Sequence, residues 1–255
     1  MKIGVLSGQR LPGLPKPVET ITVETPYGDV SMDRIMLKNQ TVFFVQRHGS
    51  SANLPPHKVN YHANIHALAS AHVDGIIAVA TVGSLNKKIK PGDIVIPHDF
   101  IDATKQRNYT FYDNQRVHVD MTDPYCHSLR NLLITTGKQH HSLTIHDKAV
   151  YLATEGPRLE TAAEIRFYST AADVVGMTGV PEVILAREKG LCYTALCVVV
   201  NMATGLQHSL TADEITHVYK QHEPALSTLI QDTIEHYESK KPCTTCAQDL
   251  TKATL

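Results

Sequence analysis

Short apolar runs and polar breaks alternate along the chain in a way that predicts an α/β fold. Residues 2–6, 75–82 and 192–200 are continuous apolar runs with the length of strands buried on both faces. Segments of helical character follow or separate them, at 127–139 and 181–189 among others. Because no internal repeat or low-complexity linker interrupts this alternation, the pattern predicts a single α/β domain around a mixed, mostly buried sheet.

Weaker patterns complete the set of expected elements. Two capping boxes, Thr161 with Glu164 and Thr211 with Glu214, predict helix starts, the second helix reaching toward Tyr237. Residues 102–120 are polar and aromatic without a clear period, which predicts a long functional loop or an interface segment. We expect the domain to span 1–238, followed by a polar tail at 239–255. Further strands are expected at 21–30, 32–37, 41–46, 94–97, 149–153 and 173–176, and further helices at 59–71 and 161–170.

Composition and charge exclude several classes of protein. The chain has 255 residues, 42% of them hydrophobic, which is enough for a substantial core. Its formal net charge of -1, without a long run of one sign, argues against partners such as nucleic acid or an anionic membrane. No apolar run approaches the roughly 20 residues of a spanning helix, and the N-terminus lacks a secretory signal. These features predict a cytoplasmic protein.

The five cysteines do not form a metal motif in sequence. Cys126, Cys192 and Cys197 are predicted to be buried thiols. Cys243 and Cys246 form a lone CxxC pair that lacks the second pair or the spaced histidines of a zinc site, and it lies outside a strand-to-helix junction. We therefore favour a polar tail with two thiols over a zinc or redox site, and expect no metal.

Hydroxyl and cationic groups at predicted strand ends are candidates for an anion site. Arg47 and His48 follow one strand, and a guanidinium fork matches the geometry of phosphate. Thr81 lies at the end of the run 75–82, beside a Gly-Ser bend, and Thr178 precedes a helix start. Each has an ordinary structural alternative, such as a surface arginine or an N-cap, so no single one identifies a site.

Two further residues could bind a heterocycle. Asn201 ends the run 192–200, and its amide can both donate and accept. Glu160 could accept from a ring N–H, or could simply favour the dipole of the helix that follows. A turn residue and a first-turn carboxylate are the structural alternatives for this pair.

Taken together, these motifs closely resemble those of the methylthioadenosine phosphorylase and purine nucleoside phosphorylase family, and most closely those of its 5′-methylthioinosine subgroup. The order and spacing of the motifs hold from Lys2 to about Asp213. The matching segments are Arg47-His48-Gly49, Pro56–Tyr61, Gly83-Ser84-Leu85, Pro91–Val95, Met121–Cys126, Glu155–Arg158, Val175–Thr178, Pro181–Val183 and Ala186–Glu188.

The resemblance implies a nucleoside phosphorylase fold, in which helices flank a mixed, barrel-like sheet. It implies cleavage of the N-glycosidic bond of a purine nucleoside by inorganic phosphate as co-substrate, without a metal or another cofactor. It further implies a homotrimer, or a hexamer built as a dimer of trimers, with active sites near subunit interfaces. The phosphate ligands it implies are Gly8, Gln9, Arg47, His48, Thr81 and Thr178, with His48 and Asn201 as the catalytic pair. The nucleoside-binding residues it implies are Val82, Gly83, Leu159, Glu160, Met177, Asn201, Ala203, Ala212, Ile215 and, from a neighbouring subunit, His118.

Positions at which members of the family differ according to their substrate predict which substrate this chain uses. Adenine-specific members have an Asp-x-Asp pattern where this chain has Asn201 and Ala203, whereas 6-oxopurine members combine an Asn with a Glu after the Gly-Pro loop, here Glu160. This predicts hypoxanthine or guanine as the base. Members that use ordinary nucleosides tend to have a histidine near the start of the last helix, where this chain has Ala212 and Ile215. An apolar wall there predicts 5′-methylthioinosine.

The first loop departs from the family pattern and keeps alternatives open. Where the family has Gly-Gly-Thr-Gly or Gly-Ser-Gly, this chain has Ser7-Gly8-Gln9-Arg10. A nucleoside-binding protein without catalysis is therefore one alternative, and an inosine/guanosine or methylthioadenosine phosphorylase is another. A metalloenzyme is suggested only by the i, i+4 pair His62 and His66, which has no Glu between its members.

Overall fold

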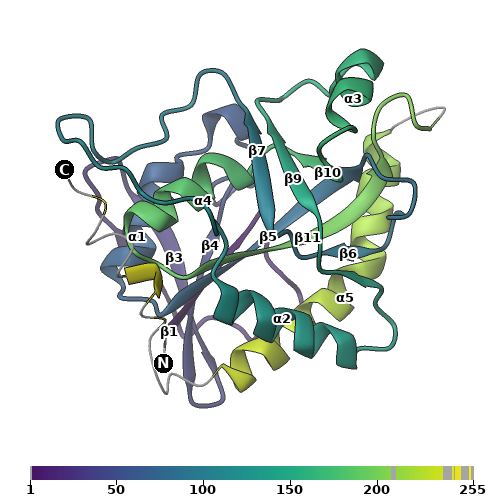
Figure 1. Cartoon of the computed structure of the whole chain (residues 1–255). Coiled ribbons are helices and arrows are strands. Elements are labelled where there is room, and N and C mark those ends of the chain that lie inside the picture. Colours follow the sequence, from purple (N-terminus) through teal and green to yellow (C-terminus); the bar gives the residue numbers. More distant parts are fainter. Residues whose placement is uncertain (1, 208–210, 238–242, 244, 248–252, 254–255) are drawn as a thin grey trace.

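A mixed sheet with helices on both faces forms the centre of the computed structural model (Figure 1). The structure describes residues 2–207, 211–237, 243, 245–247 and 253, with no side-chain description for Ala212. Within this part of the chain the strands are β1 (Lys2–Ser7), β2 (Glu19–Val23), β3 (Val30–Leu37), β4 (Gln40–Gln46), β5 (Gly75–Ser84), β6 (Ile94–Val95), β7 (Asp99–Ala103), β8 (Ile145–His146), β9 (Val150–Thr154), β10 (Val174–Gly176) and β11 (Tyr193–Met202). The helices are α1 (Tyr61–Ser70), α2 (His127–Gln139), α3 (Ala162–Tyr168), α4 (Gly179–Glu188) and α5 (Ala212–His236), with a 3₁₀ turn at Pro56–Lys58.

Strand β5 organises the sheet because it has three partners. The main order is β2-β3-β4-β1-β5-β10-β9-β7, and β11 also pairs with β5 and carries β6 and β8. The first half of β5 pairs in parallel with β1, its last two residues pair antiparallel with β10, and β11 runs parallel along its other side. A long strand with different neighbours at its two ends lets the sheet curve, as the predicted barrel-like sheet requires.

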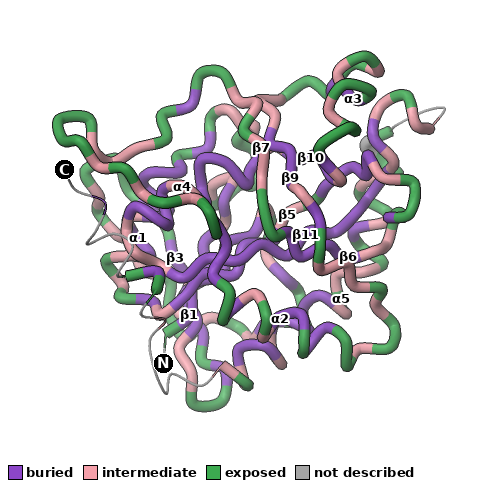
Figure 2. Tube along the Cα trace, in the orientation of Figure 1, coloured by how far each residue is buried: buried purple, intermediate pink, exposed green. Residues whose placement is uncertain are grey.

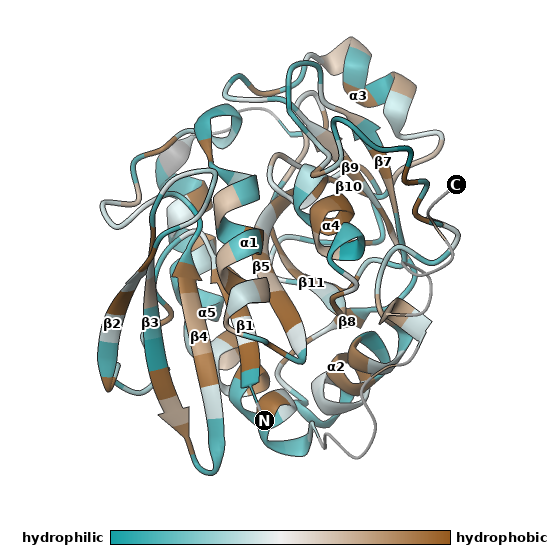
Figure 3. Cartoon of the chain, turned by 90° about the vertical axis from the view of Figure 1, so that its left-hand side faces the viewer, coloured by the Kyte–Doolittle hydropathy of each residue, from teal (hydrophilic) through white to brown (hydrophobic). Residues whose placement is uncertain are grey.

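Alternation along the central strands assigns their side chains to two apolar layers. Ile77 and Val79 of β5 belong to the layer under α2 and α5, whereas Ile76 and Ala78 belong to the layer under α1 and α4. This is the period of two expected when both faces of a strand are covered. Figure 2 shows these central strands as buried, and Figure 3 shows α1 and α5 on opposite sides of β1 and β5.

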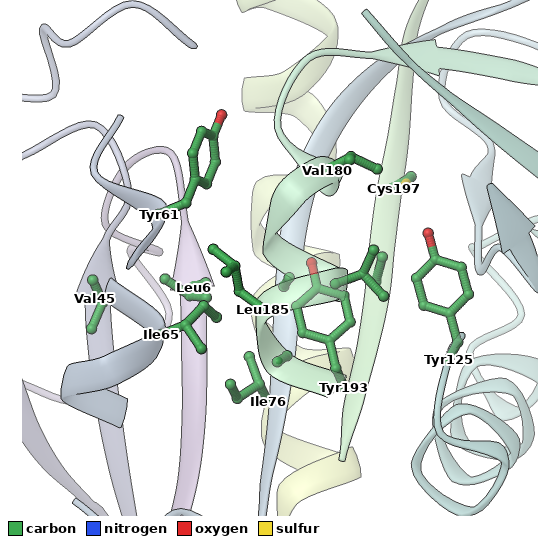
Figure 4. Packing of buried hydrophobic residues seen from close by; sticks show 14 of the residues in the cluster. Leu6, Val45, Tyr61, Ile65, Ile76, Tyr125, Val180, Leu185, Tyr193 and Cys197 are labelled. Carbon is green, nitrogen blue, oxygen red and sulfur yellow. The ribbon is translucent and has the colours of Figure 1, made fainter. Parts of the chain in front are cut away.

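The layer under α1 and α4 also contains tyrosines whose hydroxyl groups serve the polar centre of the molecule. Figure 4 shows Tyr193 beside Leu185, with Tyr125 across from it. The two tyrosine rings stack with centroids 6.2 Å apart. Because both rings are buried, the Tyr193 hydroxyl needs a partner, and it donates to Glu182 at 2.8 Å. Through this bond, Tyr193 of the core helps to hold Glu182 beside the candidate site.

The predicted single α/β domain with a mixed sheet is confirmed, and most predicted elements are present. The predicted helix at 127–139 matches α2, and both capping boxes are formed at Thr161 and Thr211. Residues 24–29, predicted as strand, instead form a turn that includes Gly28 at φ +114°, so the prediction of a strand over 21–30 was wrong there. Strands β7 and β8 were not predicted. Among the described residues, none of the helices has the length and apolarity needed to cross a membrane.

Candidate active site

A cavity of about 380 Å³ lies where β1, β4, β5 and β11 end. It brings together residues from segments more than 200 positions apart in sequence. Thr81 illustrates how the cavity interrupts the core: it is exposed although it lies in the central strand β5, between half-buried Ala80 and buried Val82, and it lines this cavity. The predicted site residues that line the cavity are Gly8, Gln9, Arg47, His48, Thr81, Val82, Gly83, Leu159, Glu160, Met177, Thr178, Asn201, Ala203 and Ile215.

Arg47 lines the cavity and is held in place by a buried carboxylate. Its Nε and Nη2 donate to the two oxygens of Glu182 at 2.6 and 2.8 Å, and its Nη1 donates to the Val79 carbonyl at 2.9 Å. Burial alone would lower the pKa of Arg47, but the charge and hydrogen bonds of Glu182 raise it above its usual value. Three of its five N–H groups thus bond to described residues, which leaves two to serve a ligand.

Glu182 is a residue that sequence reasoning did not assign to the site. Its side chain is fully buried, and it accepts from Tyr193 as well as from Arg47. The only signal in the sequence was its place in the Pro181–Val183 motif, because Arg47 lies 135 positions away. The geometry makes Glu182 a positioning residue that fixes the guanidinium of Arg47.

His48 lies beside Arg47 with its proton position set by the backbone. Its Nδ1 is 2.6 Å from the Leu54 carbonyl oxygen, and because a carbonyl only accepts, Nδ1 carries the proton. Burial lowers the pKa of His48 below its usual value, and the charge of Arg47 lowers it further. The neutral ring therefore has Nε2 as an acceptor, close to Gly8, where an added Cβ would lie 3.6 Å from Nε2.

The unusual first loop separates its two bulky residues. Gln9 lines the cavity, whereas Arg10 turns away and pairs with Asp33 at 2.7 Å and with the Pro15 carbonyl. Arg10 therefore adds no charge to the cavity. Ser7 also lines the cavity, and the Tyr219 hydroxyl interacts with the side chains of both Ser7 and Gln9 there.

Thr178 occupies the N-cap position of α4 without using its side chain as a cap. No side-chain capping bond is formed to the described residues, and the backbone N–H groups of Thr178 and Gly179 donate to the Tyr151 hydroxyl at 3.3 and 3.2 Å. The ordinary N-cap alternative thus does not account for the hydroxyl of Thr178. It lines the cavity instead.

Glu160 and Asn201 also line the cavity. The Thr154 hydroxyl donates to Glu160 Oε1 at 2.6 Å, which fixes the carboxylate while leaving Oε2 without a hydrogen bond to the described residues. Asn201 Nδ2 donates to the Met202 carbonyl at 2.8 Å, at a bulge in the pairing of β11 with β5. A Cβ at Gly83 would lie 2.9 Å from this Nδ2, so glycine is required for the close approach.

Arg107 is a second positioning residue that the sequence did not single out. It is buried and donates to the carbonyl oxygens of Glu155 and Val180 and to the Tyr61 hydroxyl. Its guanidinium also lies 5.2 Å from the centre of the Tyr61 ring. These contacts tie the 104–124 segment to the Gly-Pro loop that carries Glu160.

Two predicted site residues, Ala212 and His118, are not among the residues found to line the cavity, and His62 belongs to the metalloenzyme alternative. The side chain of Ala212 lies outside what the structure describes, although the residue begins α5. His118 is exposed and does not line the cavity of its own chain. His62, one half of the metal-like pair, has its Nε2 2.8 Å from the Thr110 carbonyl, so that nitrogen is a donor and not a metal ligand.

Comparisons with known proteins match this chain along nearly its whole length. The sequence model of the Phosphorylase superfamily matches residues 2–235. A probable S-methyl-5′-thioinosine phosphorylase of Methanopyrus kandleri is 44% identical over 253 residues, 98% of this chain and 97% of the relative. An S-methyl-5′-thioadenosine phosphorylase of Pyrococcus furiosus is 42% identical over 245 residues, 95% of each chain. A solved methylthioadenosine phosphorylase from an antarctic soil metagenomic library has a TM-score of 0.93 at 33% identity, covering 99% of this chain and 92% of that one.

Proposed function

The chain belongs to the phosphorylase superfamily, and on that premise we propose that it cleaves 6-oxopurine nucleosides with inorganic phosphate, with S-methyl-5′-thioinosine as its preferred substrate. The products are hypoxanthine and 5-methylthioribose-1-phosphate. The relatives at 44% and 42% identity carry names that differ in the purine, so the base is argued from the site. The observation that carries the proposal is that Glu160 and Asn201 line the same cavity as Arg47 and Thr178.

The base assignment follows from hydrogen-bond polarity. A 6-oxopurine has a hydrogen on N1 and an acceptor at O6, whereas adenine has an acceptor at N1 and a donor at the 6-amino group. Glu160 is acceptor-only when ionised, and Thr154 holds it in place, so it suits N1–H. The Asn201 amide can donate to O6 or N7. An adenine at these two residues would leave buried polar atoms unpaired, at a cost of about 1–3 kcal/mol each.

The proposed phosphate site provides donors for an anionic nucleophile. Arg47 is fixed by Glu182, and Thr81, Thr178, Ser7 and His48 line the same cavity. Neutral His48 accepts a hydrogen bond from the P–OH group of the phosphate dianion. This bond orients the remaining phosphate oxygens toward the other donors and toward C1′. As a phosphate oxygen attacks C1′ and the bond to N9 breaks, negative charge develops on the purine. Asn201 then stabilises this charge by donating to N7. The base leaves as neutral hypoxanthine after it takes up one proton, which balances the proton that the phosphate gives up on becoming the sugar phosphate dianion.

The 5′ end of the substrate and the assembly complete the proposal. Ile215 of α5 lines the cavity and provides an apolar wall for a methylthio group. We expect a homotrimer, in which His118 of a neighbouring subunit reaches the 5′ pocket, since His118 is exposed in a single chain. Inorganic phosphate is the only co-substrate expected.

The proposal is tested by comparing specificity constants for three nucleosides at saturating phosphate. The kcat/KM for methylthioinosine should exceed that for methylthioadenosine and that for inosine by at least about tenfold each. Faster turnover of methylthioadenosine would overturn the base assignment, and equal use of inosine would overturn the 5′ assignment. If the protein releases no hypoxanthine even at high phosphate, it would be a nucleoside-binding protein without catalysis.

A further inference from the structure

Four cysteines from three separate segments meet outside the cavity. The Sγ atoms of Cys126, Cys192, Cys243 and Cys246 all lie within 4.8 Å of one another. Cys243 Sγ and Cys246 Sγ are 3.7 Å apart, and all four cysteines are free thiols. Three of them are buried and Cys243 is half-buried. The CxxC pair thus has the second cysteine pair that it lacks in sequence.

The fold holds the two upstream cysteines in place independently of the CxxC pair. Cys126 is the N-cap residue of α2, and its backbone N–H donates to the Tyr193 carbonyl at 2.8 Å. Cys192 directly precedes Tyr193, and its own carbonyl accepts from Ile76 at 2.7 Å. Two sulfur atoms are therefore prearranged at the junction of α2 with β11. The CxxC pair reaches them from the segment that follows α5.

The spacing of the sulfur atoms fits a tetrahedral metal better than disulfide bonds. Zinc bound by four thiolates has Zn–S bonds of about 2.3 Å, which puts the sulfur atoms about 3.8 Å apart. The 3.7 Å separation in the CxxC pair agrees with that edge, and the remaining separations stay below 4.8 Å. A disulfide would need sulfur atoms about 2 Å apart. Four sulfur ligands in a tetrahedral arrangement select zinc over harder cations.

We propose that Cys126, Cys192, Cys243 and Cys246 form a closed structural zinc site that fastens the C-terminal segment to the body of the protein. Four protein ligands leave no open position for a substrate or water, which distinguishes the site from a catalytic one. The ion replaces the protons of the four thiols on binding. The site is separate from the phosphorolysis cavity, so it does not depend on the proposed function.

The fastening has a consequence for the 104–124 segment. Ala253, seven residues beyond Cys246, accepts a hydrogen bond from the His118 backbone N–H at 2.8 Å. A zinc ion at the four cysteines therefore anchors the chain segment that contains Ala253, which in turn contacts His118. Loss of the ion should loosen this contact before it affects the core.

The test is the metal content of the full-length chain purified under reducing conditions and measured by mass spectrometry of the elements. We expect one zinc per chain, and loss of that zinc in the double variant Cys243→Ser/Cys246→Ser. The matched control is Cys197→Ala, which removes a buried cysteine outside the cluster and should keep the zinc. Both CxxC positions lie after α5, so the double variant changes no residue of strands β1–β11 or helices α1–α5.

A second measurement identifies the ligands directly. Cobalt(II) added to the metal-free, reduced protein should give the intense visible absorption of a tetrahedral thiolate site, and zinc should displace it. Cys126→Ser should weaken this absorption. The proposal is overturned if the reduced chain binds no zinc, if it holds iron instead, or if the double variant retains its zinc. It is equally overturned if the purified chain contains disulfides among these cysteines and takes up no zinc after reduction.

Discussion

At the scale of single residues, the proposed phosphate site depends on Glu182, which holds Arg47 but does not itself line the cavity. Motif reasoning placed Arg47 at this site, but it expected a guanidinium fork directed at phosphate. The structure instead directs one edge of the fork at Glu182 and leaves two N–H groups for a ligand. Glu182 could not be inferred from the sequence as the partner of Arg47, because β4 and α4 are far apart along the chain and meet only in the folded structure.

Replacing Glu182 with Gln should therefore damage both stability and phosphate use. The change keeps the side-chain volume but leaves the buried charge of Arg47 without its counter-charge. We expect the free energy of unfolding to fall by about 3–5 kcal/mol and the KM for phosphate to rise. Urea unfolding and steady-state kinetics measure the two effects. Glu19→Gln breaks the exposed pair with Arg34 and should cost no more than about 1 kcal/mol; equal losses in the two variants would contradict this account.

The lowered pKa of His48 predicts a pH dependence of anion binding. An anion beside the ring favours the imidazolium, so binding should raise the pKa of His48 from its lowered value. By linkage, affinity should increase as pH falls through the pKa of the bound form and should level off below the pKa of the free form. Sulfate is the suitable probe, because its charge is constant over this range. His48→Gln should remove the dependence, and a flat profile in the native chain would count against it.

Base preference should respond to the two positions that replace the Asp-x-Asp pattern. In Asn201→Asp/Ala203→Asp, the amide donor to O6 is lost and acceptors suited to the 6-amino group and N7 of adenine are gained. The ratio of kcat/KM for methylthioinosine to that for methylthioadenosine should fall by at least about tenfold. The control is Asn114→Asp, the same chemical change at an exposed position away from the cavity. An unchanged ratio in the double variant would refute the assignment.

At the scale of elements, sequence patterns predicted those helices and strands that carry strong local signals. The helix over 127–139 and the capping boxes at Thr161 and Thr211 are local features, and the structure confirms them. Strand β8 has two residues and exists only through pairing with β6, so no local pattern could indicate it. Strand β7 carries two aspartates and is half-buried at most, which hides it in a polar segment.

The start of α5 provides a test of the 5′ pocket at this scale. Ile215 projects from the first turns of the helix into the cavity lining. Ile215→His replaces an apolar wall with a group that can hydrogen-bond a 5′-hydroxyl. The ratio of kcat/KM for methylthioinosine to inosine should fall by about tenfold or more, as expected for loss of 1–3 kcal/mol of apolar discrimination. Ile215→Val keeps the wall apolar and should leave the ratio nearly unchanged; a similar fall in both variants would argue against a polarity effect.

At the scale of the whole molecule, the features that sequence reasoning missed are contacts between distant segments. The lone CxxC pair gave no sign of a metal site because Cys192 lies 51 positions before Cys243, and Cys126 lies 66 positions before Cys192. Arg107 looked like one of many polar residues in 102–120, yet it is buried against the Gly-Pro loop. Both the cysteine cluster and the contact of Arg107 with the Gly-Pro loop form only when the fold brings distant segments together. The remaining site residues were predicted from the resemblance to a family, because their spacing in the sequence does not group them.

The expected assembly gives a whole-molecule prediction about shared active sites. If the partner subunit's His118 completes the 5′ pocket, then His118→Ala and Glu160→Gln damage different chains of the same site. Trimers refolded from an equal mixture of the two variants should contain native sites, formed by Glu160 of one chain and the His118 of its neighbour. Random mixing should restore about a quarter of the native sites. Activity of the refolded mixture measures this, with each variant refolded alone as the control. Recovery no greater than the average of the two variants would show that His118 does not act across an interface.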